Sequence, residues 1–558
     1  MRLPPKFTIE LVSNTKRADA KMSASGSNDV ALGNSKESTG GNRGEPGTSP
    51  ISGLGQSPTS QQSLDRTAAQ FSHVDLANPD AVEEELRKER THYSSNTLPG
   101  RLSEGTSRLI KGDIDKLDRP NVLRDDPSKY SLKDNSDVDN DLPPEVLLPI
   151  PTAFNALLQT NARVTPSDHW QDVRKLVLQI YPREDPQAEE LIEPYYKPGD
   201  VLTIYPLNFP ADVQALIDLM GWGDVADEPF EHHSRQGNGI PGLPTFSHPK
   251  NCFPVPNSTL RQLLLNNYDI TAIPKRIFFD QIAWHTTDPM HRERLLEFAD
   301  PQYTDEFYDY TSRPRRSILE ILYDFPSVKI PCQEIPSIFP VIRGREYSIA
   351  SGGDLLRELG TDLLRAELLV ALVKYKTVLR KTRQGLCSRY LASLKPGTII
   401  TVMISDNQGP PNKSQHIRAP LLAIGPGTGI APIRSLIYDR LTHPQAGENV
   451  VFFGGRNRKA DFYFSDEWNE LGVTMHTAFS RDQREKIYVQ DIIRQQAAVV
   501  CFLVQRGAII CLCGSSGKMP EAVRQALHDA LIIGGLATNT ENAKLILDHN
   551  VEYWEEVW

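Results

Sequence analysis

A glycine-rich turn lies between an apolar run and a segment of helical character at residues 421–436, LLAIGPGTGIAPIRSL. Residues 421–424 suit a buried strand, and Gly425, Gly427 and Gly429 allow close approach of a ligand to backbone N–H groups. The first N–H groups of a helix are unpaired and its dipole is positive there, so such a turn can hold a dinucleotide pyrophosphate. Packing alone also produces such turns, and this stretch by itself leaves both explanations open.

Two upstream stretches have residue types suited to a nucleotide with a flat ring. Residues 345–351, REYSIAS, have the form RxYSxxS. Arg345 can pair with a phosphate, Tyr347 can lie against a flat ring, and Ser348 can donate to a polar ring atom. Residues 385–391, GLCSRYL, form a small-residue turn entering a predicted helix, suited to a pyrophosphate. Taken alone, the first motif could be an ordinary exposed strand and the second a helix N-cap. The order and spacing of the two motifs favour a nucleotide site.

With these motifs in this order, the chain resembles the ferredoxin–NADP reductase type flavoproteins, and among them the diflavin reductases that include cytochrome P450 reductase. The resemblance covers about residues 152–558 and implies two cofactors, FAD and NADPH. The residues implied for FAD are Arg315, Arg345, Tyr347, Ser348, Gly385, Leu386, Cys387 and Ser388. For Arg315, a solvated helix start is an equal alternative. The residues implied for the NADPH pyrophosphate are Gly427, Thr428 and Gly429.

The same resemblance implies that Ser480, Arg481, Lys486, Tyr488 and Gln490 hold the adenosine 2′-phosphate. The chemistry of these residues agrees, because a hydroxyl, a guanidinium fork and an ammonium suit a group with up to two negative charges. The Tyr488 ring can cover the adenine. NAD lacks this phosphate, and an acidic residue at the ribose would be expected for it. NADPH is therefore favoured over NADH.

The end of the chain has the last residues of the predicted site. In the family, a cysteine before a glycine lies close to the nicotinamide, which corresponds to Cys513, although Ser515 stands where many relatives have Asp. A terminal aromatic stacks on the flavin and an acidic residue two positions earlier assists hydride transfer, which corresponds to Trp558 and Glu556. A helix-packing anchor is the alternative for Trp558. With Ser348, these residues are the predicted catalytic set.

The elements that must position these residues predict a multidomain protein. Residues 173–180 and 201–206 read as strands of a small antiparallel β-barrel, the FAD domain, at 151–418. Helical periodicity from about 211 to 340 predicts an insertion in that barrel, with Ser258 as one N-cap. Residues 419–558 are expected to form an α/β domain with a parallel sheet that binds NADPH.

The N-terminal 150 residues read as largely disordered or linker. No aromatic residue occurs between Phe7 and Phe71, and Ser, Gly, Pro and Asn dominate. A short helix is predicted at 79–90, and residues 3–9 look like the family's segment just after its FMN domain. The strands and phosphate loop of a flavodoxin-like domain are missing from this region. We therefore expect FMN only if an upstream segment or a partner supplies that domain.

Composition excludes several other classes. The net charge is -10 without a Lys/Arg block, which argues against nucleic acid. Apolar runs are far shorter than the roughly 20 residues of a membrane helix, so no membrane anchor is expected. The 6 cysteines have neither CxxC spacing nor paired histidines, which argues against a disulfide framework and a metal site. A cytoplasmic location is expected.

Within the family, the chain most resembles the NADPH-dependent diflavin oxidoreductases of cytosolic iron–sulfur assembly. Four stretches support this, together with the terminal Trp558: residues 168–174 (DHWQDVR), 313–320 (RPRRSILE), 385–388 (GLCS) and 513–520 (CGSSGKMP). The resemblance implies a protein electron acceptor, an anamorsin-type Fe–S protein. A P450 reductase-like donor to a haem protein, and a non-catalytic interaction protein that retains the fold, are the alternatives.

Overall fold

The computed structural model describes residues 141–184, 190–230, 249–357, 361, 363–376, 382–407, 409–410 and 414–558. All described residues belong to one compact unit. Residues 1–140 of the region predicted to be largely disordered or linker (1–150), including the predicted helix at 79–90 and the segment 3–9, lie outside the described residues.

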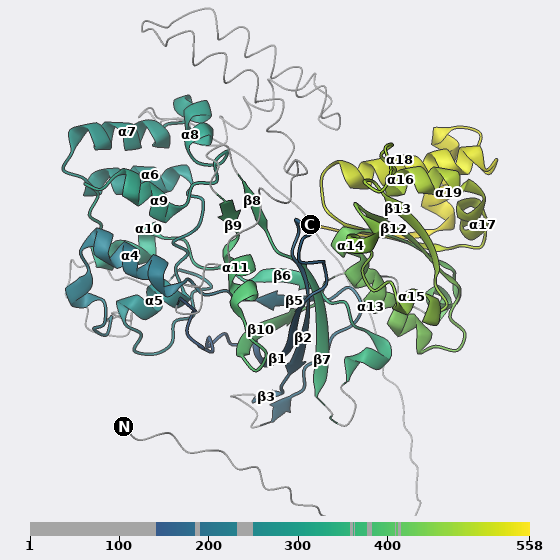
Figure 1. Ribbon diagram of the computed structural model, residues 1–558, viewed down its shortest axis with the longest axis horizontal. Coiled ribbons are helices and arrows are strands. Elements are labelled where there is room, and N and C mark those ends of the chain that lie inside the picture. Colours follow the sequence, from purple (N-terminus) through teal and green to yellow (C-terminus); the bar gives the residue numbers. More distant parts are fainter. Residues whose placement is uncertain are drawn as a thin grey trace, which may run out of the picture. The chain divides into compact units, whose positions relative to one another are not determined.

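The first half of the described chain is an antiparallel barrel built on one six-stranded sheet (Figure 1). In sheet order its strands are β6 (Arg345–Ser348), β5 (Val201–Ile204), β10 (Ile399–Ser405), β1 (Phe154–Arg163), β2 (Val173–Ile180) and β7 (Leu364–Ala371). A bridge between Ile349 and Leu368 joins the two edges and nearly closes the ring. The strands predicted near 173 and 201 both form, but they are not neighbours, because β10 and β1 lie between them.

Two short hairpins and one helix complete this half. They are β3 (Arg183–Glu184) with β4 (Leu191–Ile192), β8 (Lys374–Lys376) with β9 (Thr382–Gln384), and α11 (Leu386–Ser393). The barrel interior is filled by alternate strand residues, among them Leu176, Leu178 and Leu368, which are completely buried.

The predicted helical insertion lies between β5 and β6 in the sequence, although the two strands are neighbours in the sheet (Figure 1). Its main helices are α4 (Pro210–Met220), α5 (Leu260–Asn266), α6 (Arg276–Ile282), α7 (Pro289–Ala299), α8 (Thr304–Tyr310), α9 (Ile318–Asp324) and α10 (Ile335–Ile338). It has an apolar core of its own, centred on residues such as Phe279 and Tyr268. The expectation of Ser258 as N-cap is wrong: Thr259 caps α5 in a capping box, while the Ser258 hydroxyl donates to Val255 O at 2.6 Å.

The second half is a five-stranded sheet in which every neighbouring pair is parallel. In sheet order its strands are β13 (Thr474–Phe479), β12 (Asn449–Gly455), β11 (Leu421–Pro426), β14 (Ile509–Gly514) and β15 (Glu552–Val557). The main helices are α13 (Ile430–Leu441), α16 (Val489–Gln495), α17 (Ala497–Gln505), α18 (Lys518–Ile533) and α19 (Thr540–Asn550), gathered around this sheet in Figure 1.

Both faces of this sheet are buried, which explains the uninterrupted apolar run at the start of β11. Leu422 and Ile424 pack in one core with α16, α17 and α18, whereas Leu421 and Ala423 pack in the other with α13. Successive residues of a strand point to opposite faces, so a strand covered on both sides is apolar throughout. The predicted fold class, an antiparallel barrel with a helical insertion followed by a parallel-sheet domain, is confirmed.

Candidate active site

Three of the four predicted catalytic residues lie together where the barrel meets the parallel sheet. Cys513 on β14 is the register partner of Glu556 on β15. The hydroxyl of Ser348, at the end of β6, donates a hydrogen bond to Glu556 Oε1. Cys513 is completely buried and Glu556 is 8% exposed, so this cluster is shielded from solvent.

Burial sets the protonation of this cluster. It raises the pKa of Glu556 to about 7, against the opposing effect of the Ser348 hydrogen bond. Glu556 Oε2 is buried and has no hydrogen-bond partner within the described part of the chain. Burial, followed by the nearby Glu556 carboxylate, also raises the pKa of the Cys513 thiol well above its usual value. Cys513 is therefore a neutral thiol, whereas Glu556 can exchange a proton near neutral pH.

The fourth predicted catalytic residue, Trp558, follows directly after β15. Its backbone N–H donates to Gly514 O at 3.0 Å, and its carbonyl accepts from Ser516 N at 2.8 Å. The chain end is thus fixed to the turn after β14, two residues from Glu556. Trp558 as a whole is 49% exposed.

The predicted pyrophosphate turn lies directly against Cys513. Gly427 has a φ of 60°, in the left-handed region that favours glycine. A Cβ on Gly429 would lie 2.1 Å from Cys513 O, so no larger residue fits there without movement of the backbone. Residues 427–429 form a short 3₁₀ turn, and α13 begins at Ile430. Thr428 lies within this turn, which therefore adjoins the Ser348–Glu556–Cys513 cluster.

The two predicted flavin motifs are in contact through one hydrogen bond. Tyr347 OH donates to Cys387 Sγ at 3.2 Å, and burial raises the pKa of the Cys387 thiol to about 11. Arg345 is exposed, and its guanidinium donates to Arg343 O at 2.7 Å. Leu386, beside Cys387, is buried, with only 9% of its surface exposed.

The start of α11 is braced from the β7–β8 connection. Gly385 is its N-cap, and Ser388 Oγ accepts from Val373 N at 2.9 Å. Gly385 N donates to Val373 O at 3.3 Å. Sequence reasoning missed Val373, because a backbone contact leaves no signal in a side chain.

Arg315 is placed differently. It is exposed with a φ of 53°, and Ser317 is the N-cap of α9. Among the described residues, no hydrogen bond or ion pair joins the Arg315 side chain to either flavin motif. Its role toward FAD stays a prediction.

The predicted 2′-phosphate residues follow β13 at the edge of the sheet. Ser480 N donates to Gly455 O at 3.0 Å, and Arg481 N donates to Arg456 O at 2.8 Å, so the turns after β13 and β12 are joined. The larger side chains of the set, Arg481, Lys486 and Tyr488, are exposed. Gln490 lies in the first turn of α16, which begins at Val489.

The structure adds one cation that the sequence did not indicate. Arg458, after β12, has its guanidinium 4.5 Å from the ring centroid of Phe479 and donates to Thr477 Oγ1 at 2.8 Å. Its backbone N–H also binds the carboxylate of Asp482. Arg458 therefore lies beside the same loop as Arg481.

A buried ion-pair network joins α13 to the barrel. Arg434, 2% exposed, pairs with Glu367 on β7 at 3.0 Å and donates to Ala350 O at 2.8 Å. Burial opposes ionisation of Glu367, but Arg434, Lys175 and Arg365 outweigh it and lower the pKa of that carboxyl. Helix α13, which follows the glycine turn, is thus joined by a hydrogen bond to Ala350, two residues after Ser348.

Two family models match the chain. A model described as FAD binding domain matches residues 188–390, and one described as oxidoreductase NAD-binding domain matches residues 423–525. These ranges contain most of the predicted FAD residues and the 427–429 and 480–490 residues. Within the described residues, no helix is long and apolar enough to cross a membrane.

Several curated proteins are similar over most of the chain. A protein of Aspergillus fumigatus named NADPH-dependent diflavin oxidoreductase 1 is 43% identical, covering 79% of this chain and 70% of its own length. Proteins of the same name from Gibberella zeae and Saccharomyces cerevisiae are 42% and 32% identical, covering 83% and 84% of this chain. The matches span 77% and 74% of those two proteins.

Proposed function

Because the chain belongs to the family of NADPH-dependent diflavin oxidoreductases, we propose that it takes a hydride from NADPH onto FAD and passes the electrons to a protein acceptor. The contact of Ser348 with Glu556 carries this proposal. It places a residue of the predicted flavin motif against a residue two positions from the chain end, beside the predicted nicotinamide cysteine.

The residues present fit both cofactors. Gly429 lets the turn pack directly on the Cys513 backbone, and Gly427, with a φ of 60°, has open space where a Cβ would stand, as close approach of a pyrophosphate requires. Glu556 has a buried oxygen without a partner in the described residues, as expected for a group that awaits a ligand. The exposed Arg481 and Lys486 leave a cationic loop for a 2′-phosphate.

Each group has a distinct task in the proposal. FAD, when bound, supplies the two-electron acceptor that can release electrons singly. The Ser348 hydroxyl donates to Glu556 Oε1, and the pKa of about 7 lets the Glu556 carboxyl take up or release a proton of its own at neutral pH. Cys513 adds a neutral, compact side chain beside the site, and the Trp558 ring would lie against a bound flavin and would have to move for nicotinamide to approach.

We infer an Fe–S protein of the anamorsin type as the acceptor, with the cytoplasm as the location. The motif resemblance to reductases of iron–sulfur assembly supports the acceptor. The 6 cysteines, all free in the structure, support a reducing compartment such as the cytoplasm. The relatives are named as diflavin enzymes. For this chain, an FMN domain from an upstream segment or a partner would complete the electron path.

Purification and a cofactor comparison test the core of the proposal. The protein is expected to be yellow and to reduce ferricyanide with NADPH but not with NADH. Colourless protein, or absence of ferricyanide reduction, would support the non-catalytic alternative instead.

The acceptor is tested separately. Anamorsin-type Fe–S protein, haem protein and buffer are each mixed with the reductase, NADPH and, in a parallel series, an added FMN domain. Bleaching of the Fe–S chromophore in the first mixture alone is the expected result. Faster reduction of the haem protein would favour the P450 reductase-like alternative.

A further inference from the structure

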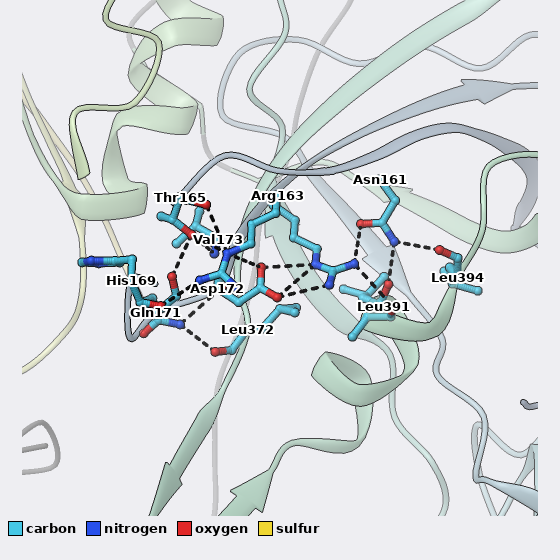
Figure 2. Close-up of polar contacts among 12 residues, drawn as sticks. Asn161, Arg163, Thr165, His169, Gln171, Asp172, Val173, Leu372, Leu391 and Leu394 are labelled. Carbon is cyan, nitrogen blue, oxygen red and sulfur yellow. Dashed lines mark hydrogen bonds and ion pairs between the residues drawn. The ribbon is translucent and has the colours of Figure 1, made fainter. Parts of the chain in front are cut away.

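Residues 168–172 of the DHWQDVR motif lie in the loop between β1 and β2, whereas Val173 and Arg174 begin β2. Contacts with the barrel fix the shape of this loop. Thr165 Oγ1 donates to Gln171 O at 2.8 Å, and Gln171 Nε2 donates to Leu372 O at 2.6 Å. The Arg163 guanidinium donates to His169 O at 2.8 Å (Figure 2). We name residues 164–172 the β1–β2 loop.

The hydrogen-bond network in Figure 2 continues from this loop to side chains of β1 and β2. Arg174 pairs with Asp172 at 3.1 Å and reaches Asn161 Oδ1 at 3.3 Å. The Asn161 amide donates to Leu391 O and Leu394 O at 2.8 and 2.9 Å. The β1–β2 loop is therefore anchored at several points, whereas His169 points away from the other labelled side chains (Figure 2).

Two side chains of the β1–β2 loop contact the parallel-sheet half. His169 Nε2 lies 3.0 Å from Asp461 Oδ1, and the two side chains are only 12% and 9% exposed. The guanidinium of Arg456 lies 3.9 Å from the ring centroid of Trp170. The Trp170 N–H is buried and has no hydrogen-bond partner in the described parts of the chain. The stacking on Arg456 is thus a principal contact of this ring.

Both partners belong to the turn that supports the predicted 2′-phosphate loop. Asp461 Oδ2 accepts from Arg456 N and Asn457 N at 3.0 and 2.8 Å, which closes the turn after β12. The carbonyls of Gly455 and Arg456 accept from Ser480 N and Arg481 N. A continuous series of short contacts therefore connects the barrel to Ser480 and Arg481.

The stacking geometry leaves the N–H donors of the Arg456 guanidinium outside the contact with Trp170. An aromatic ring contacts the face of a guanidinium, whereas the five N–H donors lie in its plane and point outward. Trp170 can therefore fix the orientation of Arg456 without using its donors. Asp461, already committed to two backbone N–H groups, holds the turn more firmly when His169 lies against its other oxygen.

We propose that His169 and Trp170 are positioning residues for NADPH selectivity. They hold the turn at 455–461, and through it Ser480 and Arg481, in the arrangement that binds the 2′-phosphate. The inference rests on the proposed function, since it assigns the 2′-phosphate to the loop after β13. It adds that selectivity depends on a loop of the FAD domain that contains none of the predicted ligand residues.

Calorimetric titration of the full flavin-loaded chain separates the 2′-phosphate from the rest of the nucleotide. The ligands are 2′,5′-ADP and 5′-ADP, which differ in phosphate position. Trp170→Ala is expected to weaken 2′,5′-ADP about fivefold, the size of a partly shielded cation–π contact, with 5′-ADP unchanged. His169→Ala removes the contact with Asp461 and is expected to weaken 2′,5′-ADP by a similar factor, again with 5′-ADP unchanged. Trp170→Phe retains a ring face and should recover most of the affinity.

A matched control removes a tryptophan for which the described residues provide no such contact. Trp284, on the helical insertion, is 66% exposed, and Trp284→Ala is expected to bind both ligands as the parent does. In steady-state assays, Trp170→Ala should raise KM for NADPH while leaving kcat unchanged, because only uniform binding is lost.

The outcomes distinguish the inference from the function beneath it. Equal weakening of 2′,5′-ADP and 5′-ADP, loss of FAD, or failure of Trp170→Phe to recover affinity would mean a structural role and overturn the inference. Unchanged 2′,5′-ADP binding in both alanine variants would overturn it as well. If the parent protein itself does not prefer 2′,5′-ADP, the proposed NADPH function is at fault.

Discussion

Replacing Glu556 by Gln tests the buried carboxyl at the centre of the site. The pKa of Glu556 rises from 4.5 to about 7 in the folded chain, mainly through burial. A shift of about 2.5 units corresponds to roughly 3 kcal/mol of differential stability between the protonated and ionised folded states.

The sign follows from which state binds the proton more tightly. Since the folded state has the higher pKa, its stability advantage is complete below the unfolded pKa of about 4.5 and is lost as the pH rises through about 7. Glu556→Gln has no proton to lose, so this part of the pH dependence should disappear. At pH 8 the variant should be more stable than the parent by up to roughly 3 kcal/mol.

The assay compares urea unfolding of parent and variant between pH 4.5 and pH 8. FAD-free protein is used, because a flavin beside Ser348 would change the burial of the carboxyl. Glu552→Gln is the control, since Glu552 begins the same strand but its side chain is 62% exposed. That variant should follow the parent.

Infrared difference spectra provide a direct readout of the same group. At pH 6 a carboxyl with a pKa of about 7 is about nine-tenths protonated, whereas one with a pKa of 4.5 is almost entirely ionised. Parent minus Glu556→Gln should therefore contain a carboxylic-acid carbonyl band at pH 6. Absence of that band, together with parallel stability curves, would refute the assignment of a raised pKa.

Three further predictions concern cofactor choice and domain coupling. Arg481→Ala should weaken NADPH by about ten- to a hundredfold, from a charge-assisted bond of roughly 1.5–3 kcal/mol; steady-state KM measures this, and an equal loss for NADH would contradict the role. Trp558→Ala should improve turnover with NADH, because it removes a ring that competes with nicotinamide; unchanged cofactor preference would count against stacking. Arg434→Met should destabilise the fold by about 3–5 kcal/mol, because Glu367 would stay buried among fewer cations, whereas Glu367→Gln together with Arg434→Met should recover part of the loss in thermal denaturation.

Local pattern predicted much of the fold. The alternation at 173–180 and the apolar run at 421–424 became β2 and β11, because period-two burial and two-sided burial are properties of short stretches. The neighbours of a strand are not such a property. β1 pairs with β10, whose residues come more than two hundred positions later, and neither local sequence specifies the other.

The site divides in the same way. The glycine turn is predicted from its own residues, whereas Cys513 and Glu556 are predicted only from the resemblance to the family. The pairing of Arg434 with Glu367 and of His169 with Asp461 depends on how two domains meet, and no periodicity records that. Ser388 illustrates a further difficulty: its hydroxyl binds Val373 N, and residue type at a helix start does not reveal which side the hydroxyl faces.

The buried Arg434 limits how freely the two halves of this chain can be exchanged with those of a relative. Its partners come from both halves: Glu367 on β7 and Glu467 after β12, at 3.0 and 2.6 Å. A chimera that joins the barrel of one protein to the parallel sheet of another would inherit one carboxylate without its guanidinium unless both parents carry the pair. Recombination points in this family are therefore constrained by charge across the junction as well as by the boundary in the sequence.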